Sequence, residues 1–256
     1  MTAPADPTVS ADPVSGARRW LVAALDLVFP ALCPVCHEAL GSGRRDPLCG
    51  ICWAGIERIA PPWCATCGLP FATFEPASPV TGCCQPCEIE PPAFTYARAA
   101  ARYDDRLRQA IHALKFGGKR ALARPLADLV YDQLGGWLDA DVDALVPVPL
   151  APERERERGF NQALLVAVRL GQRLEVPLRP EWLWRTRATR PQTDLSATER
   201  RANVRRAFAA SPAVAGRHLI VVDDVLTTGT PAAECARALS AAGARRVGVV
   251  TVARVV

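Results

Sequence analysis

Residues 218–239 predict a strand, a short polar turn and a helix in immediate succession, which places the chain in the α/β class. Four apolar, mostly β-branched residues, Leu219 to Val222, are typical of a strand buried in a parallel sheet. We expect the helix to run from Pro231 to Leu239, with Thr230 as its N-cap and Pro231 at the first helical position. The turn should therefore lie at the carboxyl end of the strand, where open α/β sheets bind ligands.

The turn itself, Thr227-Thr228-Gly229-Thr230, has the properties of an anion site. A helix N-terminus presents unpaired N–H groups and the positive end of the helix dipole, and both favour a phosphate. Gly229 allows the backbone to curl close to such a ligand, and the threonine hydroxyls add donors. The sequence thus predicts a phosphate at this turn.

Two carboxylates, Asp223 and Asp224, stand between the strand and the turn. Carboxylates repel a phosphate, so we expect them to accept hydrogen bonds from sugar hydroxyls or to help hold Mg²⁺. A 5-phosphorylated ribose satisfies every part of this pattern. The alternative is an ordinary strand–helix unit whose acids cap a turn.

Ten cysteines are present, and eight of them form four Cys-x-x-Cys pairs. This spacing indicates tetrahedral zinc in a reducing compartment rather than disulfides. Two closed four-cysteine sites have no open coordination position, so the metals should be structural. Sequential pairing is the simpler arrangement and interleaved pairing stays open, as does any part for Cys83 or His37. The expected ligands are Cys33, Cys36, Cys49, Cys52, Cys64, Cys67, Cys84 and Cys87.

Length and charge limit the class of protein further. With 256 residues, half of them hydrophobic, the chain can bury one large core beside a smaller domain. The net charge of +5 comes almost wholly from arginine, because Lys115 and Lys119 are the only lysines. Arginine suits phosphorylated ligands or nucleic acid. No apolar run is long enough to span a membrane, and we expect a cytoplasmic protein.

Three regions follow from these patterns. Residues 1–17 should be disordered, residues 18–92 should hold an amphipathic helix at 18–32 and a double zinc ribbon, and residues 93–256 should form the α/β domain. Packing is the expected role of the amphipathic helix, with a membrane anchor as the alternative. The other expected elements are strands at 94–103, 143–150 and 246–255 and helices at 104–116, 121–134 and 197–208.

Two arginine-rich stretches add candidate ligand groups. Arg154, Arg156 and Arg158 alternate with glutamates ahead of Gly159-Phe160-Asn161-Gln162, and they form either a solvated helix start or a loop that grips a diphosphate. Residues 185–195 are cationic and interrupted by proline. They predict a mobile segment that folds over an anionic ligand, or else a plain surface loop.

The segment Val222-Asp223-Asp224-Val225-Leu226-Thr227-Thr228-Gly229-Thr230 resembles the phosphoribosyl pyrophosphate (PRPP) signature of type I phosphoribosyltransferases. Together with the cysteine pairs, it resembles the ComF family of competence-associated proteins, from about Pro30 to the C-terminus. The other residues that carry this resemblance are Leu114-Lys115-Phe116, Val146 to Leu150, Arg158 to Gln162, Thr186, Arg187, Thr189, Gln192, Leu195, Glu199, Arg200, Asn203 and Phe208.

The resemblance implies a type I phosphoribosyltransferase-like parallel sheet flanked by helices and preceded by a small zinc-ribbon domain. It also implies PRPP and Mg²⁺ as ligands and, in some bacteria, a role in DNA uptake. Carried over by position, Asp223, Asp224 and Arg187 would be the catalytic residues, with the acids at the ribose hydroxyls. The 5-phosphate would meet Val225, Leu226, Thr227, Thr228, Gly229 and Thr230, and the pyrophosphate would lie near Arg154 and Arg158.

Two functional hypotheses follow, and a third is weaker. The first is a phosphoribosyltransferase in which a nucleophile displaces pyrophosphate from C1 of PRPP, with an acceptor that the sequence does not identify. The second is a module that binds single-stranded DNA, with Trp53, Trp63, Phe71 and Phe74 as stacking candidates. The third makes the ribbons a docking surface for another DNA-uptake protein.

Overall fold

The computed structural model describes residues 31–40, 46–71, 82–138, 140–186 and 207–256. Five expectations fall outside these ranges: the disordered N-terminus, nearly all of the 18–32 helix, the stacking candidate Phe74, nearly all of the cationic segment including Arg187, and nearly all of the 197–208 helix. In the described part, no helix has the length and apolar character needed to cross a bilayer.

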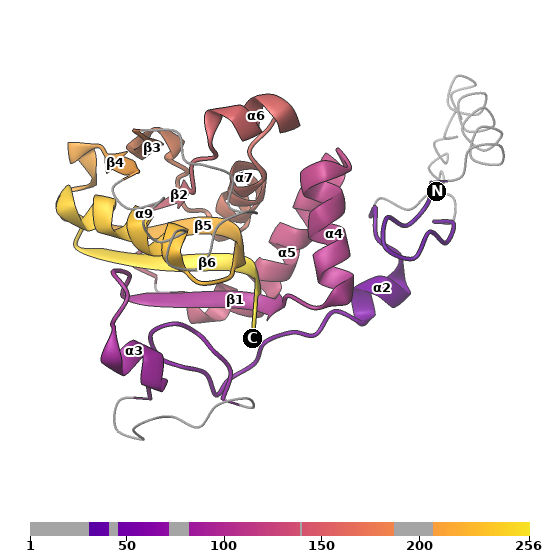
Figure 1. Ribbon diagram of the computed structural model, residues 1–256, viewed down its shortest axis with the longest axis horizontal. Helices are drawn as coiled ribbons and strands as arrows, with labels where there is room; N and C mark the ends of the chain where they lie inside the picture. Colours follow the sequence, from indigo (N-terminus) through magenta and orange to yellow (C-terminus); the bar gives the residue numbers. More distant parts are fainter. Residues whose placement is uncertain (1–30, 41–45, 72–81, 139, 187–206) are drawn as a thin grey trace, which may run out of the picture.

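A four-stranded parallel sheet forms the centre of the protein (Figure 1). Its order is β1 (Tyr96–Arg102), β6 (Arg246–Arg254), β5 (His218–Leu226) and β2 (Ala144–Pro147). The register pairs Leu226 with Arg254, so β5 and β6 end together, just before the polar turn. This confirms the predicted parallel sheet.

Helices cover both faces of the sheet. On one face lie α4 (Asp105–Phe116), α5 (Ala123–Leu134) and α7 (Gln162–Leu174), and on the other α9 (Thr230–Ala241) packs with a small antiparallel pair, β3 (Leu183–Arg185) and β4 (Phe208–Ala210). Alternate β5 residues serve the two cores, which is why every position from Leu219 to Val222 is apolar. The short elements are helices α2 (Gly50–Ala54), α3 (Gln85–Ile89) and α6 (Pro152–Arg158), and 3₁₀ turns at Arg120–Leu122, Gly135–Trp137, Pro180–Trp182 and Pro212–Val214.

Local signals explain where the elements begin and end; they correct two expectations and decide between two alternatives for the Glu/Arg run. Gly229, with φ of +73°, is the N-cap of α9 in place of Thr230, which already belongs to the helix. The Glu/Arg run is helix α6 rather than a loop, because Pro152 opens it and left-handed Gly159 ends it. Phe208 begins strand β4 instead of ending a helix, since its ring packs under the Arg185 guanidinium at 4.8 Å.

The two cysteine-rich segments attach to the sheet differently. Cys33 and Cys52 of the first segment belong to the same core as α4 and α5, and Arg106 of α4 donates a 2.8 Å hydrogen bond to the Ile51 carbonyl. The second segment has its own small core and docks on β1, where the Ala97 N–H donates to the Thr66 carbonyl at 2.6 Å. Figure 1 shows α2 beside α4 and α3 below β1.

Candidate functional site

The eight predicted metal ligands gather into two groups of four. Within each group all sulfur atoms lie within 4.8 Å of one another. The groups follow the sequential pairing, which resolves the question that spacing left open: Cys33, Cys36, Cys49 and Cys52 form one, and Cys64, Cys67, Cys84 and Cys87 form the other.

The surroundings of these sulfur atoms fit zinc. Burial acts to raise the pKa of Cys64, but hydrogen bonds from the backbone N–H groups of Cys67, Cys84 and Thr66 outweigh it and lower the pKa to about 6. The N–H groups of Cys67 and Cys84 lie 3.4 and 3.3 Å from the Cys64 sulfur. Because the thiolate is the form that binds zinc, these amides prepare the site for a cation.

Cys83 and His37 belong to neither group. Cys83 instead lies 3.3 Å from the Thr66 hydroxyl, and His37 is exposed in a turn with φ of +61°. The protein thus has two four-cysteine zinc-ribbon sites, each closed by its own ligands.

The predicted phosphate turn follows β5 directly and remains open to solvent. Thr227 and Thr228 are exposed, and Gly229 and Thr230 are half-buried. The Thr228 hydroxyl lies 3.0 Å from that of Thr230 and accepts the Thr230 N–H at 3.4 Å. As N-cap, Gly229 offers no side chain to the first turn of α9, which leaves that end of the helix suited to an external anion.

Asp224 is the buried carboxylate at the end of β5, only 3% exposed. Lys115, near the C-terminal end of α4, forms an ion pair with its Oδ2 atom, and Gln162, the first residue of α7, donates to its Oδ1 atom at 3.2 Å. Gln162 in turn accepts a 2.8 Å hydrogen bond from Arg158 of α6. The chain Arg158–Gln162–Asp224–Lys115 thus joins three helices to the strand end.

The two acids have opposite electrostatic states. Burial, reinforced by the negative charge of Asp224, raises the pKa of Asp223 well above its ordinary value. Burial also acts to raise the pKa of Asp224, but the Lys115 ammonium and its hydrogen bond lower it below the ordinary value. The pair therefore carries one firmly held negative charge, while Asp223 keeps a proton more readily and can donate as well as accept.

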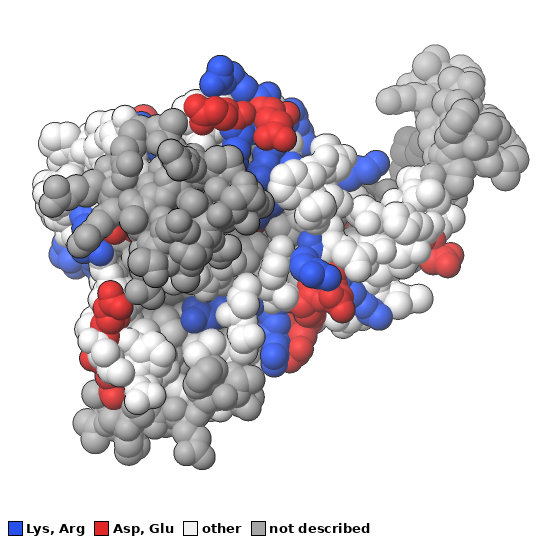
Figure 2. Space-filling model, in the orientation of Figure 1, with Lys and Arg blue, Asp and Glu red and all other residues white. Residues whose placement is uncertain are grey.

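The helical period of α6 gives the arginines of the run different degrees of burial. Arg154 and Arg158, one turn apart, are half-buried, while Arg156 is exposed. Burial, followed by repulsion from Arg154, lowers the pKa of Arg158, whose guanidinium lies 4.7 Å from the Phe116 ring centre. Figure 2 shows positive and negative side chains side by side over α6.

Three residues near the acids had no site role in our sequence predictions. They are Lys115, Gln162 and Pro149, whose carbonyl accepts a 3.0 Å hydrogen bond from Nε of Arg185, the first residue of the predicted cationic segment and the last of β3. Lys115 and Gln162 carried the family resemblance, yet nothing local in the sequence links them to Asp224. The predicted catalytic residue Arg187 lies outside the described residues.

Arg254, the last residue of β6, connects the second cysteine group to the phosphate turn. Its guanidinium donates to the Cys67 carbonyl at 2.7 Å and to the Cys67 sulfur at 3.5 Å. Its backbone neighbour across the sheet is Leu226, the residue before Thr227. The Val255 N–H donates to the Leu226 carbonyl at 3.0 Å, which fixes the start of the turn.

Comparison with known proteins agrees with both parts of the chain. Residues 24–88 match the double zinc ribbon domain family. The chain is 35% identical over 230 residues to the DNA utilization protein YhgH of Escherichia coli (strain K12), a match that covers 87% of this chain and 96% of that protein. It is 30% identical over 219 residues to competence protein F of Haemophilus influenzae, covering 82% and 91% of the two chains.

Weaker likeness extends to solved structures. Orotate phosphoribosyltransferase from Aeropyrum pernix matches at 20% identity with a TM-score of 0.34, over 61% of this chain and 80% of that one. A glutamine PRPP amidotransferase from B. subtilis matches at 20% identity with a TM-score of 0.36, over 51% of this chain and 26% of that one. On the strength of its full-length relatives, the chain belongs to the family of the YhgH DNA utilization proteins and the ComF competence proteins.

Proposed function

We propose that the protein binds PRPP at the carboxyl end of β5 and acts as a phosphoribosyltransferase in the service of DNA use. The observation that carries the proposal is the solvent-accessible Thr227–Thr230 turn at the start of α9, whose N-cap Gly229 has no side chain to offer, directly after an acid pair in which Lys115 and Gln162 hold Asp224 in place. The names of the relatives point to DNA utilization and competence, and the site chemistry points to a sugar phosphate.

Each part of PRPP has a counterpart in this arrangement. The 5-phosphate would accept hydrogen bonds from the turn, where the N–H groups and hydroxyls of Thr227 to Thr230 and the helix dipole favour an anion. Asp223 and Asp224 would hold the ribose hydroxyls. Arg154 and Arg158, on the same half-buried side of α6, would face the diphosphate as bidentate donors.

Mg²⁺ would enter with the diphosphate of PRPP. Asp224 already pairs with the Lys115 ammonium, so a cation resting on the acid pair would meet another positive charge. The acids therefore suit sugar hydroxyls better than a resident metal. Magnesium prefers to keep waters and to take its ligands from substrate phosphates, which agrees with this placement.

The proposed reaction needs positioning more than covalent help from the protein. A nucleophile forms a bond to C1 while the C1–O bond to the diphosphate breaks, and the electron pair leaves with pyrophosphate. The proton of the nucleophile passes to the released pyrophosphate or to water. Arginines and the magnesium carried by the substrate would stabilise the departing charge, and Arg187 would contribute from the segment between β3 and β4.

Calorimetric titration of PRPP with Mg²⁺ tests the proposal. We expect the zinc-loaded wild type to bind, and an Asp223→Asn/Asp224→Asn/Lys115→Met variant to bind at least about tenfold more weakly, a loss of about 1.4 kcal/mol. The triple change removes the acids without stranding Lys115, so the variant should still fold. Folded wild type that shows no heat with PRPP would refute the proposal.

A second candidate function, binding of single-stranded DNA, has an observation of its own. Trp137 is 57% exposed and meets Trp63 edge to face at 5.2 Å, while the Arg98 guanidinium lies 5.3 Å from the Trp63 ring centre. Aromatic rings beside arginine suit stacked bases. Fluorescence titration with labelled single-stranded DNA at two salt concentrations, on wild type and Trp137→Ala, separates this function from sugar-phosphate binding, since PRPP affinity should not change in that variant.

A further inference from the structure

The last turn of α4 contacts two groups of the proposed site through two neighbouring residues. Lys115 forms the ion pair with Asp224, and the ring centre of Phe116 lies 4.7 Å from the Arg158 guanidinium of α6. Successive side chains of an α-helix point about 100° apart, so a single turn can serve both groups. This end of α4 therefore links the acid pair to an arginine that we assign to the diphosphate.

Gln162 joins the same two groups from the start of α7. Its Nε2 atom donates to Asp224 at 3.2 Å, and its Oε1 atom accepts a hydrogen bond from Arg158 at 2.8 Å. A guanidinium can only donate and an ionised carboxylate can only accept, so one orientation of the amide satisfies both partners. Gln162 thus stands as a neutral spacer between two opposite charges.

The position of Arg158 depends on these two contacts because a third force acts against them. The charge of Asp224 attracts the guanidinium. If Arg158 turned onto this acid, it would occupy the acceptors that the ribose hydroxyls need and would withdraw a cation from the diphosphate. Gln162 fills the direct path, and the Phe116 ring holds the guanidinium from the side of α4. The buried Nε atom of Arg158 has no hydrogen-bond partner among the described residues, so donors remain for a ligand.

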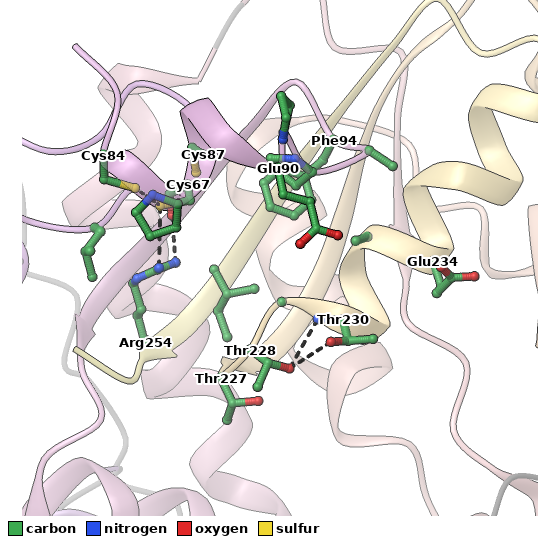
Figure 3. A pocket seen from close by; sticks show the side chains of 18 of the residues that line it. Cys67, Cys84, Cys87, Glu90, Phe94, Thr227, Thr228, Thr230, Glu234 and Arg254 are labelled. Atoms are coloured by element: carbon green, nitrogen blue, oxygen red, sulfur yellow. Dashed lines mark hydrogen bonds between the residues drawn. The ribbon is translucent and has the colours of Figure 1, made fainter. Parts of the chain in front are cut away.

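The other end of the proposed ligand is held by different elements. Figure 3 shows the turn for the 5-phosphate, with the Thr228 hydroxyl directed toward Thr230. A cavity of about 580 Å³ adjoins this turn, and its lining comes from the second ribbon, the turn, α9 and Arg254, with no residue of α4 or α6. The contacts of Phe116 and Arg158 therefore belong to the diphosphate end alone.

We infer that Phe116 is a positioning residue that keeps the Arg158 guanidinium available for the diphosphate, so that the site favours PRPP over a ribose monophosphate. The inference rests on the proposed function and adds the means by which the site selects its sugar phosphate. Phe116 is 59% exposed, and its second ring contact is with His112 of the same helix at 4.5 Å. Because the ring fills little of the core, its replacement should leave the fold intact.

Calorimetry with two probes tests the inference: PRPP with Mg²⁺, and ribose 5-phosphate, which lacks the diphosphate. Phe116→Leu keeps an apolar side chain without an aromatic face. It should bind PRPP about 3–10-fold more weakly than wild type, while ribose 5-phosphate affinity stays within about twofold. Phe116→Tyr restores the aromatic face and should bind PRPP as wild type does. In an Arg158→Met background, Phe116→Leu should cause no further loss of PRPP affinity.

Tyr131→Leu is the matched control, because Arg173 lies 4.1 Å from the Tyr131 ring centre in the same kind of contact. Arg173 is near the C-terminal end of α7, whereas Gln162 begins that helix, so this contact lies away from the proposed site. The control should leave both affinities as in wild type.

Three results would overturn the role of Phe116 and leave the proposed function in place. They are equal PRPP affinity of wild type and Phe116→Leu, equal losses of both ligands in Phe116→Leu, and a further loss of PRPP affinity in the Arg158→Met background. If folded wild type binds no PRPP, the proposed function itself is wrong and the inference falls with it.

Discussion

At the scale of single residues, the site depends on how Lys115 shares the charge of two neighbouring acids. Lys115 neutralises Asp224, and Asp223 keeps a proton more readily than an ordinary carboxyl group, so the pair can offer a donor and an acceptor where a diol would bind. A ribose offers two hydroxyls that each donate and accept. The polarity of the pair therefore matches a vicinal diol.

Replacing Lys115 should destabilise the folded protein. Lys115→Met leaves Asp224 buried without its cation, and we expect the free energy of unfolding to fall by about 3 kcal/mol at pH 7. Urea unfolding followed by circular dichroism measures the change. Adding Asp224→Asn should restore most of the stability, because the pair is then replaced as a unit. An additive further loss in the double variant would contradict the ion-pair account.

Replacing Asp223 should raise the stability of the folded protein at neutral to alkaline pH, whereas replacing Lys115 should lower it. Its pKa is raised in the folded protein by burial and by Asp224, so its protonated form adds stability below the pKa of the unfolded chain. That stability is lost as the pH rises through the folded-state pKa. Asp223→Asn is neutral at every pH, and we expect its melting temperature to exceed that of wild type by roughly 2–4 °C at pH 8 and to equal it near pH 3.

Differential scanning fluorimetry between pH 3 and pH 8 gives this comparison. A variant that is less stable than wild type at pH 8 would show that ionised Asp223 is stabilised by a partner. The same variant should bind PRPP more weakly, which would make Asp223 a residue that trades stability for binding.

At the scale of elements, the second ribbon is held on the sheet by close backbone contacts. Gly68 has φ of +71°, and a Cβ there would lie 2.4 Å from the Ala97 carbonyl oxygen of β1. Glycine is therefore needed for the approach as well as for the dihedral angle. Arg254 completes the attachment from β6.

Arg254→Ala should weaken zinc binding at the second cysteine group only. Replacing a residue that hydrogen-bonds a metal ligand usually lowers metal affinity by about 10–100-fold. We therefore expect one of the two zinc equivalents to be transferred to a colorimetric chelator about 10–100 times faster than in wild type. Arg246→Ala, at the other end of β6, is the control and should release zinc as wild type does. Equal acceleration of both equivalents in Arg254→Ala would mean a general loss of stability instead.

At the scale of the whole molecule, the two ribbons should differ in what they stabilise. The first shares its core with α4 and α5, whereas the second has a small core of its own. Cys36→Ser should therefore lower the melting temperature of the entire protein by roughly 5 °C or more. Cys87→Ser should give a separate early transition and leave the main one nearly unchanged. Calorimetric scanning distinguishes these profiles, and a single shared transition in both variants would contradict the difference.

Features with a local signature could be predicted from the sequence. Each Cys-x-x-Cys pair, the strand, the acid pair and the threonine turn lies within a short stretch, so the local sequence identifies it, whereas the way in which the cysteine pairs combine needed the structure. The contacts around Asp224 could not, because Gln162 is 62 positions away and only the fold brings it there. Phe208 was misplaced for a similar reason, since pairing with Arg185 outweighs local helical preference.

The contact between Arg254 and Cys67 has a consequence for synthesis of the protein. The two residues are 187 positions apart, so Cys67 leaves the ribosome long before its partner exists. At 5–20 residues per second the interval is roughly 10–40 s. During that time the second ribbon must keep its cysteines from oxidation and wrong partners without the contact from Arg254. The supply of zinc at the ribosome should then decide how much of the newly made chain matures correctly.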